Sequence, residues 1–285
     1  MGNALDLVRL TPLMEKTRGR PEIVIGLIDG PVALGHSDLT GAHIREVSGN
    51  NGRCDQSSSA ACLHGTYIAG ILCGKRDSSA PAICPNCTIL LRPIFAEAAE
   101  GMDQMPSATP EELAGAILDC INAGARVLNL SVALSQPSGR SERRLEEALD
   151  YAAGRGVIPV AAAGNQGTLG SSVITRHPWV IPVVAYDSHR RLLSYSNLGR
   201  SIGKRGLGAP GANITSLGLG NNLVSLSGTS VAVPFVTGTI GLLWSEFPAA
   251  SAAQVKLALI RGQAHRRTIV PPLLDAWQAY KVMGG

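Results

Sequence analysis

The sequence has few aromatic residues, no long apolar run and no concentration of charge of one sign. Aromatic side chains make up 4% of the 285 residues, whereas glycine contributes 33 residues, so we expect small side chains packed tightly between helices and sheet. No apolar run approaches the roughly 20 residues that span a bilayer. The net charge is +4 and no basic run exceeds two residues. This pattern does not support a nucleic-acid or membrane-surface role, and it favours a peptide or small molecule as partner.

The N-terminal segment lacks the apolar stretch of an export signal. Charged residues interrupt it repeatedly from Asp6 to Arg20, which leaves no room for the apolar core of a signal peptide. The chain opens Met-Gly-Asn, but Asp6 stands where a myristoylation signal carries serine or threonine. We therefore expect a cytoplasmic protein. The sequence makes no prediction about its oligomeric state.

The six cysteines are an even number in a chain without an export signal: Cys54, Cys62, Cys73, Cys84, Cys87 and Cys120. Free thiols are the default in the cytosol, and the third and sixth cysteines lie in apolar helical patterns typical of core residues. Cys84 and Cys87 have the spacing of a redox or metal motif and could form a zinc site with the first two cysteines. Under oxidising conditions a disulfide is favoured over zinc. It would lie within the Cys54–Cys62 loop or join that loop to the later pair.

Short apolar runs rich in β-branched residues alternate with helical patterns in the first 165 residues. The expected strands are 22–29, 88–95, 126–132 and 157–165, and the expected helices are 64–74, 109–124 and 141–156. This order is typical of a parallel sheet with helices on both faces. We therefore predict an α/β fold with a mostly parallel central sheet, and one domain over residues 1–285.

After residue 165 the pattern becomes mostly strand and turn. The segments are 179–186, 191–199, 206–218 and 221–228, followed by a long apolar helix near Ser230 and a last helix at 252–263. Parallel α/β sheets bind ligands at the C-terminal ends of their strands. We expect the functional groups to gather there.

The long apolar helix begins in the segment LSGTSVAVP, residues 226–234. Ser230 could be an N-cap whose hydroxyl accepts a hydrogen bond from a free backbone N–H of the first turn. Alternatively, it is a nucleophile at the positive end of the helix dipole. The second interpretation requires a base, an orienting group and an oxyanion donor elsewhere in the chain.

Three polar residues at strand exits or helix starts supply those groups. Asp29 ends the first strand, His64 opens the first helix, and Asn165 follows a buried strand. Each alone could be a turn or surface residue. Together, Ser230 would attack a carbonyl, His64 would take its proton and return it to the leaving amine, and Asp29 would fix the histidine tautomer. The Asn165 amide and the Ser230 backbone N–H would hold the oxyanion.

The segments GLIDG, HGTYIAG, AAAGN and GTSVAVP resemble, in the same order, the four signatures of subtilisin-like serine peptidases. The resemblance runs from about residue 22 to 262 and implies a three-layer subtilisin-like fold, serine endopeptidase activity and a peptide substrate. Many secreted members of that family bind calcium, but this sequence has no obvious carboxylate cluster, so we expect no cofactor or metal. The Asp-Gly-Pro after the first strand, the RPIF segment and the turn containing Cys87 resemble the cyanobactin maturation proteases. Those enzymes cut ribosomally made precursor peptides.

The resemblance also implies positions that bind substrate. Arg176 matches the floor of the pocket for the residue before the scissile bond, where the family often has a small residue. If the guanidinium lines this pocket, substrates with Glu, Asp or a hydrogen-bonding side chain are preferred; if it turns to solvent, the pocket is apolar. The family's peptide-pairing strand and the segment before the oxyanion asparagine match Leu130, Ser131, Val132 and Ala133, and Ala162, Ala163 and Gly164.

The chain departs from the family pattern without losing a catalytic group. Tyr67 stands where a second histidine is usual, Val233 where Thr, Ser or Ala is usual, and Ala133 where a glycine is usual. A related possibility is a peptide macrocyclase, but macrocyclases carry a helical insertion between the Asp and His segments, and residues 30–63 show no helical period. A third is a peptide-binding relative without activity, against which the intact triad argues.

Overall fold

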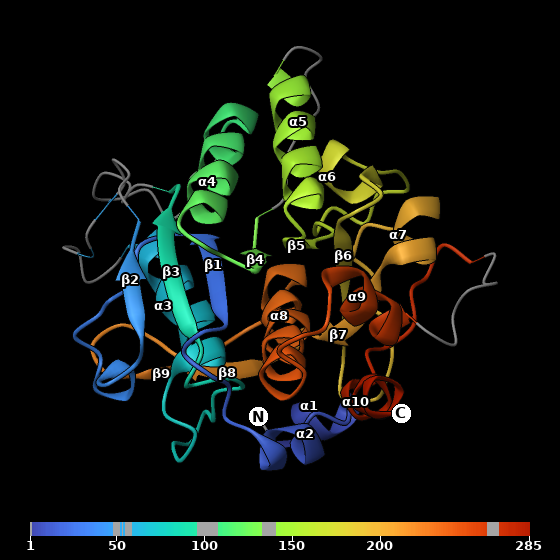
Figure 1. Ribbon diagram of the computed structural model, residues 1–285. Coiled ribbons are helices and arrows are strands. Elements are labelled where there is room, and N and C mark those ends of the chain that lie inside the picture. The colour runs from blue at the N-terminus through green and yellow to red at the C-terminus, as the bar shows by residue number, and fades with distance from the viewer. Residues whose placement is uncertain are drawn as a thin grey trace.

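A seven-stranded sheet runs through the middle of the molecule in the order β2-β3-β1-β4-β5-β6-β7 (Figure 1). Every strand pairing in it is parallel. The strands are β1 (Val24–Asp29), β2 (Ile44–Glu46), β3 (Thr88–Pro93), β4 (Val127–Leu130), β5 (Ile158–Ala162), β6 (Ile181–Tyr186) and β7 (Leu207–Pro210). The computed structural model describes residues 2–47, 52, 54, 59–95, 108–132, 141–260 and 268–285.

Helices cover both faces of the sheet and make three layers (Figure 1). One face packs against α3 (Ala60–Cys73) and α8 (Thr229–Glu246), the other against α4 (Pro110–Asn122) and α5 (Ser141–Gly154). A separate cluster of buried hydrophobic side chains fills each interface. The predicted α/β class with a mostly parallel sheet is confirmed.

Local sequence signals explain where the best-predicted helix begins and ends. Thr109 and Glu112 form a reciprocal capping box at the start of α4, and Pro110 occupies its first turn. Gly124 follows the last turn with φ +97°, a backbone conformation that favours glycine. These residues account for the agreement between the expected helix 109–124 and the observed one.

Several short elements were not expected from the sequence. Segment 191–199, predicted as strand and turn, forms mostly turns with isolated bridges. The last predicted helix is observed as α9 (Ala252–Ile260), and its remaining residues lie outside the described part of the chain.

None of the described helices has both the length and the apolar character needed to cross a bilayer. The elements that no predicted segment covers are α1 (Gly2–Leu7), α2 (Thr11–Lys16), η1 (Ser37–Leu39), β2, α6 (Val173–Arg176), α7 (Arg200–Arg205) and α10 (Ala276–Gly284). The predicted strand-and-turn segments 206–218 and 221–228 contain β7 and an antiparallel pair, β8 (Ile214–Leu217) with β9 (Leu223–Leu226).

A disulfide joins Cys54 to Cys62 in the first turn of α3, with 5.5 Å between the two Cα atoms. This is one of the two disulfide arrangements that the sequence left open. Sulfur atoms in a disulfide cannot ligate zinc as thiolates, so the four-cysteine zinc site is not formed in this state. The other four cysteines are buried free thiols.

Candidate active site

The end of β1 lies directly against the first turns of α3. A Cβ atom on Gly30 would overlap the carbonyl of Ala61, and one on Gly65 would overlap the carbonyls of Gly30 and Pro31. Only glycine permits such a close approach of two backbones. This contact explains why a glycine, Gly30, follows Asp29 and why another, Gly65, lies within the helix that carries His64.

Asp29 and His64 meet across this contact. Asp29 is fully buried, and its Oδ1 lies 2.7 Å from His64 Nδ1 and accepts a 2.7 Å hydrogen bond from the backbone N–H of Gly30. Burial lowers the pKa of His64, but the negative charge of Asp29 and the hydrogen bond to it raise that pKa above its ordinary value. The carboxylate therefore holds the imidazole in one orientation and stabilises its protonated form.

The prediction that His64 opens its helix is wrong. Helix α3 begins at Ala60, because the hydroxyl of Ser59 accepts a hydrogen bond from the N–H of Cys62 and caps the first turn. His64 is thus the fifth helical residue, in the second turn. Since the field of a helix end falls off within its first turn, Asp29 and burial determine the protonation of His64.

Ser230 lies near the start of α8 with its hydroxyl toward His64. Its Oγ is 3.1 Å from His64 Nε2, so one continuous chain of contacts links Asp29, His64 and Ser230. The N-cap interpretation of Ser230 is wrong, because α8 begins at Thr229 and the residue before it is Gly228, which has no capping side chain. Ser230 is the second residue of the helix.

Asn165 follows β5 and faces the same point. Its Oδ1 accepts two 2.9 Å hydrogen bonds from Thr229, one from the backbone N–H and one from Oγ1. This leaves the amide Nδ2 free to donate. Gly228 has φ +154°, and a Cβ there would lie 3.2 Å from Asn165 Nδ2 and 3.5 Å from Ser230 Oγ, so glycine keeps the space between these two groups open.

Thr229 is a site residue that the sequence analysis did not single out. Its Oγ1 also accepts a 3.2 Å hydrogen bond from the backbone N–H of Gly164, so it links the end of β5 to the start of α8. The signal was present as the threonine directly before the serine in GTS, but a threonine in that place is also an ordinary helix-start residue.

The predicted substrate segment divides at the end of β4. Leu130 is fully buried and pairs with β1 on one side and β5 on the other, so it supports the sheet and offers no open edge. Ser131 and Val132 lie beyond the strand and are buried, while Ala133 lies outside the described residues. An unpaired backbone edge for a peptide therefore begins no earlier than Ser131.

The second predicted substrate segment leads from β5 to Asn165. Ala162 and Ala163 are buried, and the backbone N–H of Ala163 still donates to Val183 on β6. Gly164 turns away with φ +104°, which directs Asn165 toward Ser230. Because these side chains are small, they leave room for a substrate beside this segment.

Arg176, at the end of α6, has an anionic partner within the chain. Its Nη2 lies 3.6 Å from Oε2 of Glu142, at the start of α5, and the Arg176 side chain is 50% exposed. Arg205 fixes the backbone here by donating a 2.6 Å hydrogen bond to the Arg176 carbonyl. Glu142 was missed in the sequence, because 34 residues separate it from Arg176 and nothing local marks their contact.

Tyr67 has a structural role in place of the family's histidine. Its ring is fully buried, and its hydroxyl donates to the carbonyl of Ile214 on β8. Burial raises the pKa of this hydroxyl well above its ordinary value. Tyr67 thereby joins α3 to the β8–β9 hairpin. Val233, the other departure within the described residues, is fully buried in α8.

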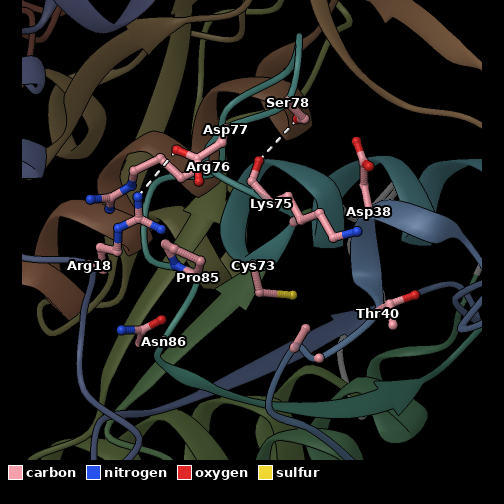
Figure 2. A pocket seen from close by; sticks show the side chains of 13 residues that line it. Arg18, Asp38, Thr40, Cys73, Lys75, Arg76, Asp77, Ser78, Pro85 and Asn86 are labelled. Carbon is pink, nitrogen blue, oxygen red and sulfur yellow. Dashed lines mark hydrogen bonds and ion pairs between the residues drawn. The ribbon is translucent and has the colours of Figure 1, made fainter.

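A hollow of about 280 Å³ lies at the C-terminal end of α3, lined by Arg18, Cys73 and Arg76 among others (Figure 2). Arg18 turns toward Asp77, with 3.2 Å between the paired atoms. The Arg76 guanidinium donates to carbonyls of the chain itself, at Met14, Thr17, Ala82 and Ile83. Both arginines therefore hold neighbouring segments together, and we assign no ligand to this hollow.

A model of the subtilase family matches residues 20–271. The chain belongs to the subtilase family. The matched region contains Asp29, His64, Asn165 and Ser230. This subtilase is 33% identical over 235 residues to the thermophilic serine proteinase of Bacillus sp. (strain AK1), which covers 81% of this chain and 54% of that protein. It is 32% identical over 242 residues to subtilisin DY of Bacillus licheniformis, which covers 82% of this chain and 81% of that protein.

Solved structures show the same fold. The protease domain of PatA, in a mutant form, superposes with a TM-score of 0.82 at 30% identity, covering 93% of this subtilase and 97% of that chain. The prenylagaramide maturation protease PagA has a TM-score of 0.83 at 28% identity, covering 97% and 99%. The PatG macrocyclase in complex with peptide has a TM-score of 0.82, but at 21% identity it is a likeness of fold alone. The subtilisin-like fold and the resemblance to cyanobactin maturation proteases are confirmed, and this subtilase is placed among the subtilisin-like serine endopeptidases.

Proposed function

We propose that this subtilase cleaves peptide bonds through an acyl-enzyme on Ser230. The observation that supports this most strongly is the chain of contacts from Asp29 Oδ1 to His64 Nδ1 at 2.7 Å and from His64 Nε2 to Ser230 Oγ at 3.1 Å. Both distances allow hydrogen bonds, and the base is in turn oriented by a buried carboxylate. This is the geometry that nucleophilic catalysis by serine requires.

The proposed reaction has two steps that share the same groups. His64 accepts the proton of Ser230 as Oγ attacks the substrate carbonyl, and the charge on the carbonyl oxygen is stabilised by Asn165 Nδ2 and the backbone N–H of Ser230. His64 then gives the proton to the leaving amine. In the second step His64 deprotonates a water as the water attacks the acyl carbonyl. The bond to Ser230 Oγ then breaks, His64 returns the proton to Oγ, and the new carboxyl terminus is released.

The substrate that we propose is a ribosomally made precursor peptide. The support is the likeness to the PatA protease domain and to PagA, described as a prenylagaramide maturation protease, over nearly the whole chain. We also propose that Ser131–Ala133, Ala162–Gly164 and Arg176 contact that peptide. A single domain, a cytoplasmic location and the absence of a cofactor stay predictions.

Transpeptidation by the same triad is the alternative chemistry, suggested by the fold of the PatG macrocyclase. Hydrolysis is favoured because, between Asp29 and α3, the residues that the structure describes form only the short η1 and the edge strand β2. Macrocyclases of this family carry a helical insertion there. Mass spectrometry of the products from a peptide library separates the two, because hydrolysis adds the mass of water and cyclisation does not.

The decisive test of the proposed function is the substitution Ser230→Ala. We expect the fold to remain and turnover to fall by about 10⁶-fold, because the hydroxyl serves the chemistry. A fluorophosphonate probe should label the wild type and leave the variant unlabelled. Peptidase activity in a pure sample of the variant would end the assignment of Ser230 as nucleophile.

A further inference from the structure

Asn129 is a buried amide in the middle of the sheet that the triad does not explain. It lies on β4 between β1 and β5 and is fully buried, whereas the other three residues of β4 are aliphatic. Its Nδ2 donates a 2.7 Å hydrogen bond to Ser131 Oγ, and its Oδ1 has no partner among the described residues. Burying an amide is unfavourable unless it is hydrogen-bonded, so this residue calls for a specific reason.

The hydrogen bond continues to the nucleophile. Ser131 Oγ donates to the backbone carbonyl of Ser230 at 3.2 Å. Because Asn129 donates to the oxygen of the Ser131 hydroxyl, the hydroxyl hydrogen is left to point at that carbonyl. The hydrogen bonds are thus donated in one direction, from Asn129 on the sheet to Ser131 and from Ser131 to the Ser230 carbonyl at the start of α8.

The Ser230 carbonyl needs this donor because of the proline inside α8. In an α-helix the carbonyl of residue 230 accepts from the N–H of residue 234, but residue 234 is proline and has no N–H. A proline ring also pushes against the carbonyl four residues earlier. Pro234 therefore deprives the Ser230 carbonyl of its helical partner, and the Ser131 hydroxyl replaces that partner.

We propose that Asn129 and Ser131 are positioning residues that fix the peptide plane of Ser230, and with it the direction of the Oγ atom and of the oxyanion-binding N–H. The proposal rests on the proposed function, since it assumes that Ser230 is the nucleophile. Ser131 is also the first residue beyond β4, where the substrate peptide is expected to pair. Ser131 therefore belongs to the segment that is expected to align the substrate and also donates to the backbone carbonyl of the proposed nucleophile.

The test is a double-mutant cycle on Ser131 and Pro234. Ser131→Ala leaves the Ser230 carbonyl without a donor, and we expect kcat and the rate of fluorophosphonate labelling to fall about 10- to 100-fold with KM little changed, the scale expected for a small misplacement of a reacting group. Adding Pro234→Ala supplies the missing helical N–H. The double variant should recover most of the lost labelling rate, so the two substitutions should be strongly non-additive.

Three controls separate positioning from general stability. Ser131→Thr keeps the hydroxyl and should keep most of the labelling rate. Asn129→Asp retains the shape but accepts from Ser131, which turns the hydroxyl hydrogen away from Ser230, so it should lose rate as Ser131→Ala does. Thr239→Val removes another buried hydroxyl of α8, which donates to the Phe235 carbonyl at 2.7 Å, and should leave the labelling rate unchanged whatever its effect on stability.

Each result decides between the two proposals. If the wild type is not labelled, the proposed function and the positioning proposal both fail. If the wild type is labelled and Ser131→Ala is labelled equally fast, only the positioning proposal fails. It also fails if Pro234→Ala does not restore the rate to a folded Ser131→Ala protein. Should Ser131→Ala not fold, a Ser131→Thr variant labelled as slowly as Asn129→Asp would overturn it.

Discussion

In the proposed mechanism, the protonation state of His64 sets the pH range in which this subtilase acts. His64 must then be neutral to accept the Ser230 proton, and the pKa of His64 lies above its ordinary value. We therefore expect kcat/KM to rise with pH and to reach half its maximum above pH 6.5, the value of an unperturbed histidine. A profile that is flat between pH 5 and 8 would count against His64 as the base.

The same profile tests the role of Asp29. Burial lowers the histidine pKa and the charge of Asp29 raises it, so Asp29→Asn should leave burial as the dominant effect. The midpoint of the profile should move to lower pH while kcat falls by about 10⁴-fold. An unchanged midpoint in a folded variant would show that Asp29 does not set the pKa of the base.

Substitutions at Arg176 and Glu142 should change, in opposite directions, the preference for an acidic substrate residue before the scissile bond. In the free enzyme Glu142 neutralises Arg176, so an acidic substrate side chain would compete with it. If Arg176 lines the pocket, Arg176→Gly should reduce the preference for Glu over Leu by roughly 1–3 kcal/mol. Glu142→Gln should increase that preference, because it frees the guanidinium.

The measurement is the ratio of kcat/KM for matched Glu and Leu peptides in each variant. The control is Arg143→Ala, which removes an exposed arginine of α5 that pairs with Glu147 at 3.0 Å and should leave the ratio unchanged. A ratio that is the same in wild type and Arg176→Gly would place Arg176 outside the pocket.

At the scale of helices and strands, α3 is attached at its start by the Cys54–Cys62 disulfide, two residues before His64. A bridge across a loop of about eight residues stabilises the folded state by roughly 2.5 kcal/mol in the chain-entropy model. Reduction with dithiothreitol should lower the denaturant midpoint accordingly. In Cys54→Ser the midpoint should already be low, and the reductant should lower it no further. An unchanged midpoint in the reduced wild type would contradict this role.

Elements with a strong local signal could be predicted from the sequence, and those that depend on distant partners could not. The strands β1, β3, β4, β5 and β6 and the helix α4 are marked by apolar runs, caps and terminal glycines. The start of α3 was misplaced because residues 30–63, which include the capping Ser59, show no helical period in the sequence. The α1, α2 and α10 helices are short, and short helices are stable only through tertiary packing.

The residues of the candidate active site also divide into those that a local sequence pattern marks and those that depend on distant partners. Asp29, His64, Asn165 and Ser230 stand in recognisable segments, and the parallel sheet brings its strand ends to one edge. Their supporting partners have no local signature. The Ser131 hydroxyl acts on a carbonyl 99 residues away, and the reason for that contact, Pro234, has meaning only once the helix is known.

At the scale of the whole molecule, both ends of the chain pack onto the same body (Figure 1). The backbone N–H of Ala276 donates to the Val8 carbonyl at 2.9 Å, and Arg9 pairs with Asp275 at 3.0 Å. The sheet runs without interruption between the two buried clusters. The two ends of the chain are therefore joined to each other by hydrogen bonds, and we expect one cooperative unit.

This expectation can be tested by comparing two probes of unfolding in urea. The tryptophans report on different regions, since Trp179 precedes β6, Trp244 is buried in α8 and Trp277 lies on α10. Labelling of Ser230 by a fluorophosphonate reports only on the active site. In a single cooperative domain the fluorescence change and the loss of labelling should share one midpoint. A fluorescence transition that begins while labelling is still complete would show that a part such as α10 unfolds separately, and would contradict a single domain over residues 1–285.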